Sequence, residues 1–272
     1  ISEAKNLEIE IKFSYVVVAA KGYKKVKSAD IAKISDNKKD LSNIENIECD
    51  CICVSGFWTP SIHLASQSGN KSEFNEKIDA FIPKKSKQKE NTIGSANGKF
   101  TLEETINEAF DKGYEVSNKI TENNNKVSIP TVVEKKSTEH DKFWCVPLPK
   151  GKSYKRFLDF QNDVAVTDIE LALREGFRSI EHVKRYTTLG MATDQGKTSN
   201  LNGLQLVSDI ENKVVPQVGH TTFRPPYTPV SIGAIVGREV GKHSKPTRKS
   251  PMHEWHEKNN AVFVDAGVWL RP

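Results

Sequence analysis

The sequence predicts a mixed α/β chain: an N-terminal α/β module, a polar linker, a small helical module and a proline-rich tail. Apolar alternation and β-branched runs mark the N-terminal part as strand-rich. Capping residues before apolar stripes mark short helices after residue 154. Frequent prolines argue against long helices after Val215. These observations place the segments at 1–120, 121–153, 154–214 and 215–272.

Three runs in the first segment have strand character. Residues 7–20 (LEIEIKFSYVVVAA) mix alternation with an apolar run, which predicts one half-exposed and one buried strand. Residues 24–34 alternate lysines with apolar side chains, as in an exposed antiparallel strand. Residues 47–54 predict the most buried strand of the three, which ends where a glycine and a proline turn the chain between 55 and 60.

Three of the four cysteines lie in that last run, at Cys49, Cys51 and Cys53, with Cys145 far along the chain. Alternation puts the three on one face of a strand. Metal sites more often use a turn-forming CxxC pair, so we expect buried thiols that behave as small hydrophobes, and no metal site.

Helices are predicted from capping patterns. Thr101 and Glu104 form a capping box for a helix that runs to about Lys112, where Gly113 is expected to end it. The asparagine-rich stretch 121–141 reads as linker. Three further helices are expected in the second half, with caps at Thr167, Ser179 and Ser199.

Composition excludes some classes of function. The formal net charge is +5, with both signs spread along the chain, which argues against nucleic-acid binding. No apolar run is long enough for a membrane span and the start has no signal-peptide core, so we expect a cytoplasmic protein. The first residue is not Met, and we expect a piece of a longer chain.

The stretch from Lys184 to Asn200 is the sharpest local feature. Glycines, threonines and basic residues beside a helix start favour an anion, most naturally a phosphate group. A P-loop is rejected, because five residues separate Gly190 from Gly196 and a helix, not a strand, precedes. The candidate contacts are Lys184, Arg185, Thr187, Thr188, Lys197 and Thr198.

A second candidate is the loop Gly94 to Gly98, which lies between a short apolar segment and a capped helix. Dinucleotide-binding folds place backbone amides against a pyrophosphate at such a point, although glycine and asparagine are also ordinary turn residues. The candidates are Gly94, Ser95, Asn97 and Gly98. His182, His253 and His256 form no clear ligand pattern, and we expect packed or surface histidines. No catalytic triad stands out.

Long irregular strings carry a resemblance to the alpha subunits of heterotetrameric sarcosine oxidase. Residues 174–197 (REGFRSIEHVKRYTTLGMATDQGK) are similar to that family nearly residue for residue. Four other strings are also similar: CDCICVSGFWTPSIHLASQS at 49–68, DFQNDV at 159–164, TTFRPPYTP at 221–229 and AGVWLRP at 266–272.

The resemblance implies an amine oxidoreductase of the EC 1.5.3 class that works only in a complex with beta, gamma and delta subunits. It implies NAD on this subunit, FMN at the interface with the beta subunit, FAD on that partner, and tetrahydrofolate on a following domain. Residues 1–120 would then be the C-terminal part of a FAD/NAD(P)-binding-like domain, with Gly56 joining the glycine loop in the NAD site. The GxGxxG fingerprint would precede Ile1 and the folate domain would follow Pro272.

The same resemblance implies a helical module related to ferredoxin-like [2Fe–2S] modules but without a cluster. In relatives that hold a cluster, four cysteines bind it, and the matching positions here are Asp159, Gln161, Asp194 and Ser199. Oxygen and amide groups do not replace thiolates as cluster ligands. Two other hypotheses stay open: a non-catalytic scaffold for partner subunits, and an iron–sulfur electron carrier, against which the absent cysteines count.

Overall fold

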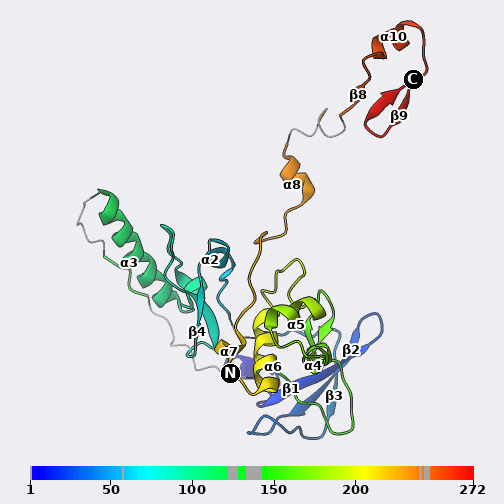
Figure 1. The fold of residues 1–272 in the computed structure, drawn as a ribbon. Coiled ribbons are helices and arrows are strands. Elements are labelled where there is room, and N and C mark those ends of the chain that lie inside the picture. The colour runs from blue at the N-terminus through cyan, green and yellow to red at the C-terminus, as the bar shows by residue number, and fades with distance from the viewer. Residues whose placement is uncertain (1, 57, 122–127, 133–142, 239–240, 242–245) are drawn as a thin grey trace. The chain divides into compact units, whose positions relative to one another are not determined.

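In the computed structural model the chain forms two compact units, Ile1–Tyr227 and Thr228–Pro272 (Figure 1). The structure describes residues 2–56, 58–121, 128–132, 143–238, 241 and 246–272. The mixture of helices and strands confirms the α/β class in its coarse form.

The first unit begins with α1 (Ser2–Asn6) and an antiparallel sheet in the order β1 (Tyr15–Gly22), β2 (Val26–Lys33) and β3 (Glu45–Glu48). The central strand is buried from Ser28 to Ala32. The prediction of an exposed strand at 24–34 is therefore wrong at its centre. β2 pairs on both sides, and its Asp30 carboxylate, 1% exposed, accepts hydrogen bonds from Lys21 and Asn46 at 2.9 and 2.8 Å.

The predicted cysteine strand is also wrong. β3 ends at Glu48, opposite Ser28, and the last ladder bond runs from the Cys49 amide to the Lys27 carbonyl at 3.1 Å. Beyond that point β2 turns back toward β1, so the following residues have no partner strand. Cys51 and Cys53 are exposed and Cys49 is half-buried. The expectation of buried thiols fails with the strand.

The next part of the unit holds α2 (His63–Gln67), the hairpin of β4 (Ser72–Asn75) and β5 (Ala80–Pro83), the 3-10 helix η1 (Gly94–Asn97) and α3 (Leu102–Thr121). Thr101 caps α3 as predicted, with its hydroxyl accepting from the Glu104 amide at 3.2 Å. Gly113 does not end the helix.

An ion-pair ladder supports α3 past that glycine. Lys112 and Lys119 flank Glu115 at 2.8 and 2.7 Å and lower its pKa to about 2. A glycine in a helix interior costs only about 1 kcal/mol, which this ladder and two further turns of helix offset.

The helical module contains a short hairpin, β6 (Phe157–Asp159) and β7 (Val164–Ala165), followed by α4 (Val166–Arg174), α5 (Ile180–Thr187), α6 (Asn200–Glu211) and α7 (Val215–Val218). Ser179 and Ser199 occupy the predicted N-cap positions. Thr167 does not, because α4 starts after Ala165, whose amide donates to Asp168 at 2.8 Å.

The main core lies in this module. It is formed by Leu158, Val164, Val166, Ile169, Ala172, Leu173, Ile180, Val183, Leu189, Leu204, Leu206, Val207 and Val215, with Ile62 and Phe81 from the N-terminal part. The N-terminal part and the helical module therefore share one apolar interior, and this interior holds the candidate site described below.

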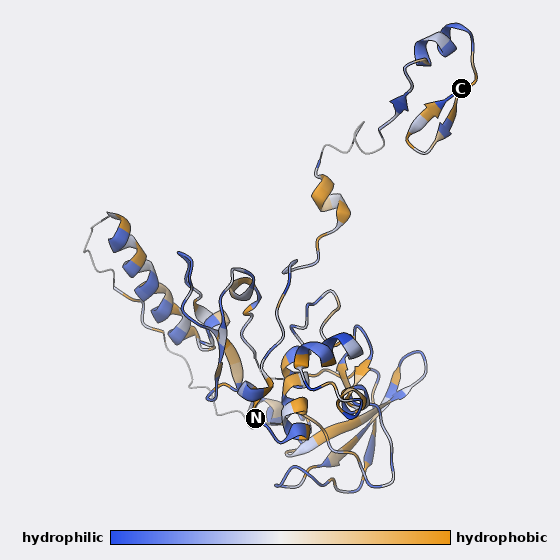
Figure 2. Ribbon diagram, viewed as in Figure 1, coloured by the Kyte–Doolittle hydropathy of each residue, from blue (hydrophilic) through white to orange (hydrophobic). Residues whose placement is uncertain are grey.

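The second unit contains α8 (Ile232–Val236), α10 (His253–Lys258) and a small sheet in the order β8 (Arg248–Lys249), β10 (Trp269–Arg271), β9 (Val264–Ala266). Helix α8 is hydrophobic along most of its length (Figure 2). The proline-rich tail is thus not extended throughout as predicted.

Parts of the predicted linker, 122–127 and 133–142, lie outside the described residues. Within the described part of the chain, no helix combines the length and the apolar character that a bilayer crossing requires.

Candidate functional site

The basic loop, defined as residues 184–199, runs from the last turn of α5 to the N-cap of α6. α5 stops because Thr188 adopts a left-handed backbone with φ of 63°. The Thr187 hydroxyl donates to the Val183 carbonyl at 2.8 Å and accepts from the Leu189 amide at 3.3 Å. The predicted contacts Thr187 and Thr188 therefore also serve as the C-terminal cap of α5, with the Thr188 hydroxyl donating to the Thr187 carbonyl at 2.6 Å.

Two side chains from the β6–β7 hairpin hold the loop. Asp159, 2% exposed, accepts from the Gly190 amide at 2.8 Å and from the Gln161 amide at 2.9 Å. The Gln161 side-chain carbonyl accepts from the Thr193 hydroxyl at 2.6 Å and the Asp194 amide at 3.4 Å. These are two of the positions that the resemblance aligned with cluster cysteines. Here they stabilise the loop by hydrogen bonds alone.

Asp194 organises the end of the loop. Its carboxylate accepts from the Gly196 amide at 3.0 Å, the Thr198 amide at 3.3 Å and the Thr198 hydroxyl at 2.7 Å. Burial alone would raise the pKa of Asp194, but these hydrogen bonds and Lys197 lower it. The hydroxyl and amide of Thr198, a predicted phosphate contact, are thus already bonded within the chain.

Two glycines are required by the close approach of Asn200. A Cβ built on Gly190 would lie 2.0 Å from Asn200 Oδ1, and one on Gly196 would lie 2.2 Å from Asn200 Nδ2. Both glycines also have positive φ, 66° and 72°. The Asn200 side chain is 6% exposed and finds no hydrogen-bond partner among the described residues.

The basic residues at the start of the loop form a cationic cluster with the exposed Arg224. Lys184 is half-buried, and burial, Arg185 and Arg224 lower its pKa, while Glu181 raises it. Glu181 is bonded to the Arg185 guanidinium at 3.0 Å and to the Thr222 amide at 2.6 Å. Lys184 and Arg185 act on Glu181 and Arg224 acts on Lys184, so the positive charges of the cluster outnumber its carboxylate. Lys184 itself has no ion pair within 4 Å among the described residues.

Lys197, the other predicted basic contact, points elsewhere. Its ammonium donates to the Tyr227 carbonyl and to the Asp194 carbonyl at 3.3 Å, and lies 4.4 Å from the centre of the Tyr227 ring. These contacts tie the end of the loop to the segment after Phe223. The structure therefore places the predicted residues in two groups: Lys184 and Arg185 in the cationic cluster, and Lys197 and Thr198 at the bonded end of the loop.

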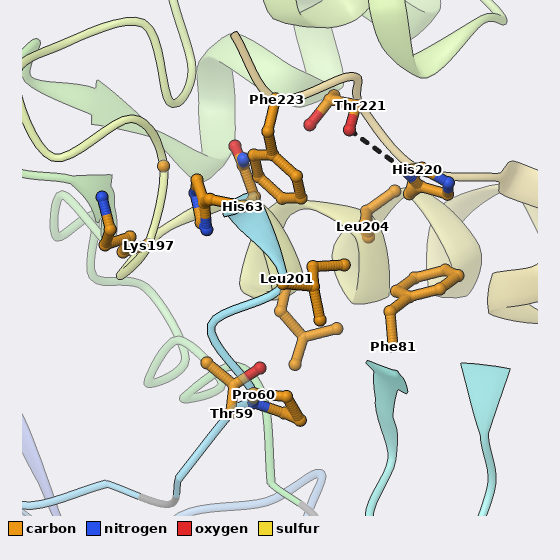
Figure 3. Close-up of a pocket in the computed structure, with 13 residues that line it drawn as sticks. Thr59, Pro60, His63, Phe81, Lys197, Leu201, Leu204, His220, Thr221 and Phe223 are labelled. Atoms are coloured by element: carbon orange, nitrogen blue, oxygen red, sulfur yellow. Dashed lines mark hydrogen bonds between the residues drawn. The ribbon is translucent and has the colours of Figure 1, made fainter. Parts of the chain in front are cut away.

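His63 was missed by the sequence reasoning. Its Nε2 lies 3.0 Å from the Gln195 carbonyl, and its ring packs 3.8 Å from that of Phe223 (Figure 3). Burial lowers the pKa of His63, as do Lys197 and Lys184. A carbonyl only accepts, so Nε2 carries the proton and Nδ1 presents a lone pair with no described partner. The only sequence signal was its place within the family-like string 49–68.

A small cavity lies beside His63. It has a volume of about 40 Å³ and is lined by α6 residues, Phe81 and the segment 220–223 (Figure 3). That volume holds one or two waters and no cofactor ring system. The cavity is therefore too small for a cofactor. The cationic cluster is the part of the site that can take a larger anion.

The glycine loop, defined as residues 94–98, differs from the basic loop. The Gly94 amide and the Asn97 side-chain amide both donate to Glu108 of α3, each at 2.7 Å. Gly98 ends the 3-10 helix with a left-handed φ of 77°. A carboxylate of the chain therefore lies where a pyrophosphate oxygen would bind, and this arrangement does not fit the predicted NAD contact.

The remaining predicted positions are spread out. Ser95 and Gly56 are exposed, and Gly56 has open space on its Cβ side. No hydrogen bond or ion pair among the described residues joins the glycine loop to the basic loop. His182 is exposed, while His253 is buried against Phe263 in the second unit. Within the described ranges, no three histidine, cysteine or acidic side chains converge in a way that could hold a metal ion.

Comparison with known proteins shows which family of proteins this chain resembles. Residues 153–238 match the family model described as the sarcosine oxidase A3 domain. The chain is 39% identical over 228 residues to the sarcosine oxidase subunit alpha of Rhizobium meliloti, a match that covers 84% of this chain and 23% of that protein. It is 34% identical over 260 residues to the subunit of the same name from Corynebacterium sp. strain U-96, covering 90% and 26%.

The chain thus spans about a quarter of the length of the curated relatives it matches. Among solved structures, L-proline dehydrogenase from P. horikoshii is similar with a TM-score of 0.50 and 20% identity, covering 87% of this chain and 47% of that one. That likeness concerns the fold alone.

Proposed function

The chain belongs to the family of sarcosine oxidase alpha subunits, and we propose that it supplies part of the flavin and beta-subunit interface of such a complex. The complex would oxidatively demethylate sarcosine or a related N-methyl amine to glycine and pass the one-carbon unit to tetrahydrofolate. FAD would lie on the beta subunit, FMN at the interface, and tetrahydrofolate on a domain that follows this segment, with gamma and delta subunits completing the assembly.

The observation that carries the proposal is the unbalanced charge at the start of the basic loop. Lys184 and Arg185 act on one carboxylate, that of Glu181, and Arg224 adds a third positive charge beside Lys184, whose pKa is lowered by burial and by its basic neighbours. An unpaired, half-buried cation is unfavourable, and an anion with several oxygens relieves it. The phosphate of FMN has that chemistry, so the residues fit the group.

The hydrogen bonds beneath the loop support the same role. Asp159, Gln161 and Asp194 fix the loop backbone, which means that an arriving phosphate would not have to order it. In this arrangement Lys184 and Arg185 would offset the phosphate charge, while Lys197 and Thr198 position the loop. When bound, the flavin supplies the capacity to accept electrons from the amine, and the chain supplies binding and electrostatics.

NAD binding by residues 1–120 stays a prediction. The glycine loop does not support it in its present arrangement, because Glu108 occupies the Gly94 amide. Gly56, Ser95, Asn97 and Gly98 remain the positions at which that prediction can be tested.

The second candidate function is a non-catalytic scaffold that organises partner subunits. One observation favours it: the basic loop is already tied down by hydrogen bonds of the chain, and Lys197 is bonded to Tyr227. A loop that only joins two helices would show the same network. It would not require the unpaired Lys184, which is why the flavin interface is the stronger proposal.

The test is flavin retention in the complete complex. We expect Lys184→Gln with Arg185→Gln to lower the FMN content and to weaken FMN binding by about tenfold or more, since a hydrogen bond to a charged group contributes about 1.5–3 kcal/mol. Lys152→Gln, at an exposed position of the same unit, is the matched control. Normal FMN content with normal assembly in the double variant would reject the interface role and leave the scaffold.

A further inference from the structure

Two exposed thiols lie in contact on the segment between β3 and α2. The sulfur atoms of Cys51 and Cys53 are 3.9 Å apart, and both side chains are exposed. The described residues between Cys49 and Ile62, all but residue 57, belong to no helix or strand. Neither the proposed flavin site nor the core uses these sulfurs.

The geometry suits covalent pairing. A disulfide needs an S–S separation of about 2.05 Å, and the thiols already touch at van der Waals distance. No regular hydrogen-bonded structure fixes the backbone here, so side-chain rotation and a small backbone adjustment can close the gap. A disulfide across a single intervening residue closes a small ring, and strained, exposed disulfides are the readily reduced ones.

We propose that Cys51 and Cys53 form a reversible dithiol–disulfide site that exchanges with small-molecule disulfides such as glutathione disulfide. One cysteine of the pair attacks the small disulfide and the other resolves the mixed disulfide that forms. Neither the pairing nor the exchange depends on the proposed flavin function, so the two proposals can be tested independently.

Exchange proceeds in two steps. The thiolate of one cysteine attacks one sulfur of the small disulfide, breaks its S–S bond and releases one thiolate. The other cysteine, whose sulfur lies 3.9 Å away, then gives its proton to solvent and attacks the sulfur of the first cysteine, which releases the second thiolate. The small disulfide is reduced to two thiols and the cysteine pair is oxidised.

The other two cysteines serve as internal references. Cys49 is half-buried and interacts with Cys51 only through charge, while the sulfur contact is with Cys53. Cys145 is half-buried, and burial raises its pKa despite an Arg156 nitrogen 3.3 Å from its sulfur. Because Cys49 and Cys145 are half-buried, a small disulfide reaches their sulfurs less readily than it reaches those of Cys51 and Cys53.

The experiment uses the full chain with its co-purifying partners, equilibrated with mixtures of reduced and oxidised glutathione, quenched by alkylation and digested with trypsin. No Lys or Arg lies between Asp40 and Asn70, so one peptide, residues 40–71, carries the three neighbouring cysteines. We expect this peptide to lose two hydrogens in oxidising mixtures, with fragmentation placing the bond between Cys51 and Cys53, and to regain them in excess reduced glutathione.

Serine variants test the pairing. Cys51→Ser should trap glutathione on Cys53, and Cys53→Ser should trap it on Cys51, because each variant lacks the second thiol that would release it. Cys49→Ser should behave as the wild-type chain. The proposal is overturned if peptide 40–71 stays fully reduced in the most oxidising mixture, if fragmentation places the bond at Cys49, or if neither Cys51→Ser nor Cys53→Ser retains a glutathione adduct. The wild-type fragmentation decides the matter if a variant fails to fold.

Discussion

The glycine loop and the basic loop look alike in sequence, since both place glycines and small polar residues before a capped helix. In the structure they differ in where the nearest carboxylate lies. At the glycine loop, Glu108 binds the Gly94 amide directly. At the basic loop, Asp159 and Asp194 bond the backbone while Lys184 keeps no ion pair within 4 Å among the described residues. The acidic side chain that folds onto a loop decides whether its positive groups remain available for a ligand.

The largest expected effect is the loss of stability when the hydrogen bonds that hold the basic loop are removed. Asp159→Ala removes the acceptor of the buried Gly190 amide and of the Gln161 amide, so we expect the free energy of unfolding to fall by about 2–4 kcal/mol, measured by urea denaturation. Asp159→Asn keeps one acceptor oxygen and should lose about half as much. Equal stability of wild type and Asp159→Ala would show that the loop does not need the hydrogen bonds of Asp159 to keep its conformation.

The stability lost on substituting a loop glycine should depend on Asn200. Gly196→Ala brings a Cβ within 2.2 Å of Asn200 and adds strain at positive φ, and we expect a loss of about 2–3 kcal/mol. Combined with Asn200→Ala, the total loss should be at least 0.5–1 kcal/mol smaller than the sum of the single losses. Additive losses in this double-mutant cycle would mean that the contact does not constrain the loop.

Inorganic phosphate should distinguish the two loops. We expect it to stabilise the wild-type protein by about 1.4 kcal/mol when its concentration is ten times its dissociation constant. Lys184→Gln should lose most of this gain, yet be slightly more stable than wild type without phosphate, because the pKa of Lys184 is lowered in the fold. Thermal melts with and without phosphate measure both effects, and an equal gain in the variant would place the anion elsewhere.

At the glycine loop, Glu108→Ala should cost about 1–2 kcal/mol in urea denaturation, because the Gly94 amide loses its partner. Glu108→Gln keeps an acceptor without the charge and should cost less. We expect the NAD content of the intact subunit to be the same in both variants as in wild type. A gain of NAD in Glu108→Ala would mean that this carboxylate competes with the cofactor, and would restore the glycine loop as its site.

The smallest expected effect is a pH dependence from His63. Its pKa is lowered below 6.5 in the fold, so the folded protein takes up the proton less readily than the unfolded chain. The contribution of neutral His63 to the free energy of unfolding is complete above about pH 6.5, and it is lost as the pH falls toward the pKa of His63 in the folded protein. His63→Gln should flatten stability between pH 7 and 5. An unchanged slope in the His63 variant would contradict the assignment.

Local patterns predicted the helical module well. Ser179 and Ser199 mark the starts of α5 and α6 because a helix N-terminus is specified within a few residues. Predictions failed where distant residues decide. The burial of Asp30 depends partly on Tyr154, 124 positions away, with its hydroxyl 3.4 Å from the carboxylate. The cysteine run has strand character, but a strand needs a partner, and β2 begins at Val26, only two residues before its last pair with β3, so it is too short on that side to supply one.

The candidate site was predictable in part. Composition identified Lys184 and Arg185 as candidate contacts, but the sequence predicted them beside a helix start, whereas the structure places them in the last turn of α5. The same reasoning could not tell that Lys197 would bond to Tyr227, nor that Glu108 would reach the Gly94 amide from another element. His63 escaped for the same reason, since its partner, the Gln195 carbonyl, lies 132 positions away.

The contact of Asn200 with Gly190 and Gly196 also bears on how this chain can evolve. Gly190 and Gly196 both face Asn200, the first residue of α6, and a side chain at either glycine meets less steric conflict once the asparagine has become smaller, with the strain of positive φ remaining. We therefore expect substitutions at these sites to arise in a fixed order, with position 200 changing first. In collections of related chains, Ala or Ser at 190 or 196 should occur on backgrounds that have already lost the amide at 200.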